Sequence, residues 1–120
     1  MKIPGPDHPI TIEPAKGRVV VRFGDTVVAD TTQALELREA SYPAVLYVPR
    51  GDAVMAHFAG TAHGTHCPYK GDARYFDLAA GGATAANAVW SYETPYPAMA
   101  RIKDHLAFYP QHVQIERSAT

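Results

Sequence analysis

Short apolar runs, separated at frequent intervals by turn residues, dominate the pattern of this chain. Arg18–Phe23 and Thr26–Asp30 are rich in β-branched valine and lie on either side of Gly24 and Asp25, which predicts a β-hairpin. In Ala34–Glu39 apolar and charged residues alternate, so this segment is expected to be a strand with one buried face.

The rest of the chain has the same pattern of short segments and turns. It predicts short helical turns at 50–57 and 95–104 and a loose hairpin connection at 79–88. No window has a helical period beyond about two turns. Further strands are expected at 44–48, 74–78, 88–92, 105–109 and 113–116. Many short strands with frequent turns indicate an all-β, mainly antiparallel fold, a small barrel-like domain of two sheets with short helical turns.

The length of 120 residues fits one hydrophobic core. We expect residues 1–17 to form an extended N-terminal lead-in, residues 18–116 a single domain, and residues 117–120 a tail. The start of the chain has no apolar signal region, and the longest apolar run, Ala44–Val48, is far too short to cross a membrane. A cytoplasmic protein without membrane contact is therefore expected.

The charge balance and the cysteine count limit the classes of partner. Eleven basic and 12 acidic residues give a net charge of -1, so no general field attracts nucleic acid, and an anion must be bound locally. One cysteine allows neither an internal disulfide nor a four-thiolate zinc site. The sequence predicts no cofactor.

The stretch Thr65–Gly71 (THCPYKG) places several reactive or polar groups together. Pro68 stiffens the backbone and Gly71 allows a sharp turn, so such a loop can hold side chains in fixed positions. Lys70 offers a point cation suited to phosphate or carboxylate, and Tyr69 offers a flat ring with a polar tip. Both are predicted ligand-binding residues, and Lys70 is also a catalytic candidate.

Cys67, the only cysteine, has three interpretations. It is a candidate nucleophile whose thiolate Lys70 or His66 would favour, or it is inert packing, as buried cysteines commonly are. His63, His66 and Cys67 also have the spacing of a metal tripod. Adjacent residues of an extended segment point to opposite faces, so His66 and Cys67 are poorly placed to share an ion, and we predict no metal site.

Trp90 and Tyr92 project to the same face of a predicted strand. They are either core anchors or an aromatic wall on which a planar ligand stacks. If Glu39 points inward from its strand, its carboxylate can pair with Lys70 or Arg50 across the fold, and that pair would be structural as easily as catalytic.

Several segments together resemble the family catalogued as domain of unknown function 427, over about Val19 to Val113. Its characteristic elements are CPYKG followed by x-A, and W-x-Y-x-x-P. The matching segments are VADTTQALELRE, YPAVLYVPRGDAV, CPYKGDARYF, AVWSYETPYP and HLAFYP.

The resemblance implies a β-tent, in which two antiparallel sheets meet at an angle, similar in outline to methionine-R-sulfoxide reductases and the Mss4 zinc proteins. The two CxxC pairs that hold zinc in those relatives are absent here, so the zinc is not carried over. The family is also catalogued as nucleotidyltransferase-like, but the Gly-Ser motif with paired aspartates that this activity requires is absent.

Three functions follow as alternatives. The first is the binding of a small anionic or nucleotide-like ligand in a pocket between the sheets, lined by Trp90 and Tyr92, with Lys70 and Tyr69 at its mouth. The second is a thiol enzyme that depends on Cys67. The third is a structural or interaction domain without a ligand. Because edge strands can pair between copies, a homodimer is one possible assembly.

Overall fold

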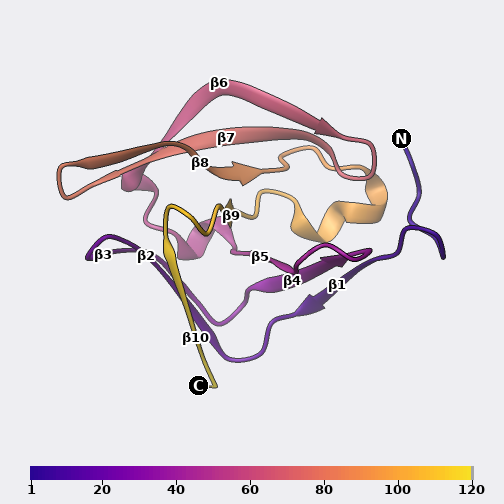
Figure 1. Cartoon of the computed structure of the whole chain (residues 1–120), viewed down its shortest axis with the longest axis horizontal. Helices are drawn as coiled ribbons and strands as arrows, with labels where there is room; N and C mark the ends of the chain where they lie inside the picture. Colours follow the sequence, from indigo (N-terminus) through magenta and orange to yellow (C-terminus); the bar gives the residue numbers. More distant parts are fainter. Residues whose placement is uncertain (120) are drawn as a thin grey trace.

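The computed structural model describes residues 1–119, whose strands form three antiparallel sheets (Figure 1). One has the order β1 (Ile10–Pro14), β4 (Leu35–Glu39), β5 (Val45–Tyr47). The second has the order β10 (Gln114–Ser118), β2 (Arg18–Phe23), β3 (Thr26–Thr31). The third has the order β6 (Phe58–Cys67), β7 (Gly71–Ala80), β8 (Ala83–Ser91), β9 (Ala107–Phe108). Three 3-10 helices connect them: η1 (Arg50–Asp52), η2 (Met55–His57) and η3 (Pro97–Ile102).

The predicted all-β, mainly antiparallel fold with short helical turns is confirmed. The predicted hairpin is present as β2 and β3, with a left-handed Gly24 (φ +58°) in the turn. The strands divide among three sheets rather than two, and none of these sheets closes as a barrel. Figure 1 shows the four-stranded sheet on one side of the molecule and the two three-stranded sheets facing it.

Two strands occupy segments where none was predicted. Ile10–Pro14, expected as part of a lead-in, forms β1 and pairs along its whole length with β4. Phe58–Cys67 forms the ten-residue β6, so Cys67 ends a strand and only Pro68, Tyr69 and Lys70 lie between β6 and β7. The connection expected at 79–88 is tighter than predicted, because only Gly81 and Gly82 lie between β7 and β8. Both glycines have positive φ, as a two-residue hairpin turn requires.

The core has two parts. The larger lies between the β2–β3 hairpin and the four-stranded sheet, with Val19, Val28, Leu78 and Val89 fully buried. The smaller packs Leu37 and Tyr47 against β7 and η3, and it forms the floor of the candidate site described below. Within residues 1–119, no helix has the length and apolar character needed to span a membrane.

Candidate functional site

A cavity of about 260 Å³ lies between two of the sheets, near the smaller part of the core. β4 and β5 supply one wall, β7 and β8 supply the other, and the turn before β7 supplies Lys70. Its size is near the lower end of the range for small-molecule sites. The lining residues are Leu37, Glu39, Tyr42, Pro43, Val45, Tyr47, Lys70, Tyr75, Trp90, Tyr92 and Tyr109.

The polar end of this cavity is an ion pair. Lys70 Nζ donates a hydrogen bond to Glu39 Oε1, and the two side chains are 9% and 17% exposed. Lys70 is the only charged residue among the buried residues of 1–119. A buried charge is tolerated only when it is paired, so Glu39 is what allows Lys70 to lie here.

The turn that carries Lys70 is held by backbone bonds on both sides. Lys70 O accepts a hydrogen bond from Tyr96 N at 3.0 Å, and Pro68 O accepts one from Lys2 N at 2.7 Å. Gly71 has φ +107°, and a Cβ at this position would lie 3.5 Å from Thr94 O. Glycine therefore permits the positive φ of this turn, whereas a Cβ would meet the 94–96 backbone only at an ordinary contact distance.

Hydrogen bonds link the aromatic side chains that line the cavity. Trp90 Nε1 donates to Tyr47 Oη at 3.4 Å, and the Trp90 ring lies 4.5 Å from the Tyr109 ring. Tyr75 Oη lies 3.3 Å from Tyr109 Oη and 3.0 Å from Thr65 Oγ1. The wall is thus aromatic but carries several hydroxyl groups, which suits a planar ligand with polar substituents.

Three of the tyrosines that line the cavity, Tyr47, Tyr92 and Tyr109, keep their hydroxyl groups protonated at neutral pH. Burial raises the pKa of Tyr47 and of Tyr92 well above the ordinary value for a phenol. Burial and the hydrogen bond with Tyr75 raise the pKa of Tyr109 to about 12. These three side chains are therefore neutral phenols that donate or accept hydrogen bonds.

Glu39 is the negative group of the site. Burial alone would raise its pKa, but hydrogen bonds from Lys70 and His8 outweigh burial and hold the pKa below the usual value. His8 Nε2 lies 2.7 Å from Glu39 Oε2. The carboxyl group is therefore ionised at neutral pH, between two basic side chains.

The structure brings together three of the residues that the sequence singled out, because Lys70, Trp90 and Tyr92 all line this cavity. Lys70 is buried and paired with Glu39. Tyr69 is not among the lining residues. Its ring stacks on His8, with centroids 4.2 Å apart and planes 5° apart.

Cys67 is half-buried at the end of β6 and packs against the smaller part of the core. Its Sγ lies 3.7 Å from Lys70 Nζ, the same ammonium that pairs with Glu39. It does not line the cavity.

The two histidines of the suggested tripod have other partners. His66 Nδ1 lies 2.7 Å from Asp72 Oδ1, and the His63 ring lies 4.5 Å from that of Tyr75. Over the part of the chain that the structure describes, no group of three or more His, Cys, Asp or Glu side chains could hold a metal ion.

Sequence reasoning did not select Tyr47, Tyr75 and Tyr109 as members of the site. The signal was present for the first two, because Tyr47 and Tyr75 each lie within a strand that the sequence predicts, and both side chains are buried there. Tyr109 follows a two-residue strand, too short to show any alternation.

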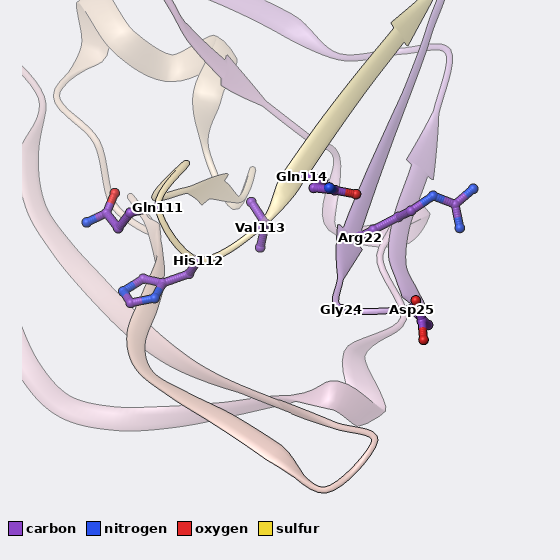
Figure 2. A pocket seen from close by; sticks show the side chains of 7 residues that line it. All are labelled: Arg22, Gly24, Asp25, Gln111, His112, Val113 and Gln114. Atoms are coloured by element: carbon purple, nitrogen blue, oxygen red, sulfur yellow. The ribbon is translucent and has the colours of Figure 1, made fainter.

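A second hollow, of about 380 Å³, lies beside the β2–β3 turn (Figure 2). Figure 2 shows Gln111 and His112 pointing to one side and the Arg22 guanidinium to the other. Arg22 Nε also donates to Glu116 at 2.6 Å. These polar groups do not converge on one point, so this hollow lacks the arrangement of a binding site.

Comparison with known families gave a match over residues 11–119, nearly the whole chain. The matching model is described as Domain of unknown function (DUF427) and has the short name NTP_transf_9. Comparison with curated proteins gave no match.

Proposed function

Because the chain belongs to the DUF427 family, whose description names no function, we propose a function from the cavity itself: it binds a small, planar, nucleobase-like ligand. The ring lies against the aromatic wall formed by Trp90, Tyr75 and Tyr109. Its polar edge faces the pair of Glu39 and Lys70. The observation that carries the proposal is that both partners of a buried ion pair line the cavity.

The pair has hydrogen-bonding capacity left for a ligand. Lys70 Nζ has three donor protons, and its partners among the described residues are Glu39 and Cys67. The Glu39 carboxylate has about four acceptor sites, and it binds Lys70 and His8. One donor beside one acceptor is complementary to the edge of a lactam or an amide, which presents N–H next to C=O.

The same pair disfavours a simple anion. Glu39 remains ionised and neutralises most of the field of Lys70, so a carboxylate or phosphate that enters here meets a negative charge close by. Of the two ligand types expected from the sequence, the nucleotide-like one therefore fits this site through its uncharged base, and the merely anionic one fits less well. The lactam edge also leaves no charge to be desolvated.

Trp90 makes the proposal testable, since it is the only tryptophan of the chain and gives a single indole N–H signal by NMR. We would titrate labelled protein with 2-pyridone, which has a lactam edge, and in parallel with benzoate, benzylammonium and toluene. The proposal predicts a saturable shift of the indole signal with 2-pyridone at the lowest concentration. A stronger response to benzoate would favour an anionic ligand instead, and no response to any probe would contradict ligand binding.

Two variants locate the response. Tyr42→Ala removes an exposed ring that lines the cavity, and Tyr96→Ala removes a tyrosine ring that does not line it. Binding of 2-pyridone should weaken several-fold in the first variant and stay unchanged in the second. Equal effects in both variants would mean that the probe binds elsewhere.

The thiol-enzyme alternative has one observation in its favour, the contact between Cys67 and the ammonium of Lys70. Against it, Lys70 also pairs with Glu39, and Cys67 lies outside the cavity lining. A small-molecule substrate in this cavity would therefore not face the thiol.

A further inference from the structure

An apolar groove of about 380 Å³ adjoins the candidate site. Leu46 of β5, Phe108 of β9 and Ile115 of β10 line it together with Pro110. The β5 and β9 sides are joined by the backbone pair of Val48 and Leu106, with both hydrogen bonds at 2.8 Å. The groove is thus part of the main fold and not a gap beside a loose terminus.

The groove and the cavity border one another. Four residues line both: Tyr42, Pro43, Val45 and Trp90. The indole N–H of Trp90 is directed to Tyr47, which lines only the cavity. The polar atom of the shared tryptophan is therefore engaged on the cavity side, and the groove is left with carbon surface and the Tyr42 hydroxyl.

Large apolar side chains are exposed along this groove. Tyr42 is 65% and Ile115 36% exposed. Ile115 lies between Gln114 and Glu116 on an outer strand, where a polar side chain would be the ordinary choice. Contiguous apolar surface that lines a groove is a candidate site for the apolar part of a ligand or partner.

We infer that the ligand of this domain is amphipathic: its planar polar head occupies the cavity and its apolar chain or ring crosses the rim at Tyr42 and Pro43 into the groove. This inference rests on the proposed function. A second copy of the chain is the weaker candidate for the groove, because nine residues line it and a stable protein interface takes roughly 20–30 residues on each side. Continuity with a polar cavity also favours one molecule that has both characters.

The test is a series of 2-pyridones that carry a methyl, butyl or hexyl chain on a ring carbon, titrated into the wild type by calorimetry. Each methylene that enters the groove should tighten binding roughly three- to fourfold. In Ile115→Ser the affinity gained from the alkyl chain should fall several-fold, whereas the dissociation constant of unsubstituted 2-pyridone should stay the same. Val54→Ser is the matched control, because Val54 is 45% exposed and lies outside the groove.

The outcomes separate the two proposals. If 2-pyridone binds but the alkyl chain adds no affinity, or adds the same affinity in Ile115→Ser as in the wild type, the inference of an amphipathic ligand is wrong and the proposed function stands. If no member of the series binds, both are wrong. If sedimentation equilibrium shows a dimer that Ile115→Ser dissociates, a second copy occupies the groove and the inference is overturned.

Discussion

Lys70, in the turn between β6 and β7, donates a hydrogen bond to Glu39 at the end of β4, so one ion pair joins two sheets at the edge of a cavity. The two residues are 31 positions apart in the chain. We expect the pair to stabilise the fold at this point, and it supplies the polar end of the proposed site.

The first prediction concerns stability. Lys70→Met should lower the free energy of unfolding by about 1–3 kcal/mol, because it leaves the half-buried Glu39 carboxylate with His8 alone. Lys103→Met, at an exposed position, should change it by less than about 0.5 kcal/mol. Urea unfolding of Lys70→Met, Glu39→Gln and the double variant would give the coupling energy, and a value near zero would show that the pair contributes nothing.

The second prediction concerns acid. Because the pKa of Glu39 is lowered in the folded protein, its contribution to stability is fully present above the unfolded pKa of 4.5 and is lost as the pH falls through the folded value. The difference in unfolding free energy between the wild type and Glu39→Gln should therefore be constant near neutral pH and shrink below pH 4.5. A difference that stays constant down to pH 3 would contradict the ion pair.

The third prediction concerns the turn that positions Lys70. Gly71→Ala should destabilise the protein by about 1–2 kcal/mol, since alanine is strained at φ +107°. Gly51→Ala is the matched control, because no atom lies within 4 Å of its Cβ position and its φ is not positive. Thermal unfolding of both variants would measure this, and equal melting temperatures would show that the turn tolerates a side chain.

The fourth prediction concerns Cys67. A half-buried thiol packed against the core should react with iodoacetamide several-fold more slowly in the folded protein than in urea. Mass spectrometry over time at pH 7 measures both rates. Faster reaction in the folded state would favour the thiol enzyme over the ligand-binding domain.

Strands with alternating or β-branched residues could be predicted from the sequence. The β2–β3 hairpin and β4 are examples. Because side chains alternate along a strand, a Glu39 that points inward from β4 could be expected to pair with either Lys70 or Arg50, and the structure has the pair with Lys70. β6 could not be predicted in this way, because its glycine, alanine, threonine and histidine residues are mostly exposed and give no apolar period. The direction of the Tyr69 side chain depends on turn geometry and could not be predicted from the residue pattern; its ring stacks on His8 and is not among the residues that line the cavity.

The site depended even more on tertiary structure. Trp90 and Tyr92 could be selected as one face of a strand, but Tyr75 and Tyr109 join them only because β7 and the segment after β9 lie beside β8. The burial of Lys70 was not predictable either, since a lysine beside a glycine in a turn is ordinarily exposed. The domain boundaries expected from the sequence remain predictions.

The most direct test of the account compares two probes that differ by one hydrogen bond. 2-Pyridone can donate its N–H to Glu39 and accept from Lys70, whereas N-methyl-2-pyridone cannot donate. Calorimetry should give a dissociation constant at least about tenfold weaker for the methylated probe, the loss expected when a ligand cannot make its hydrogen bond to a charged acceptor. Equal affinities for the two probes, or binding of neither, would contradict recognition of a lactam edge by Glu39 and Lys70.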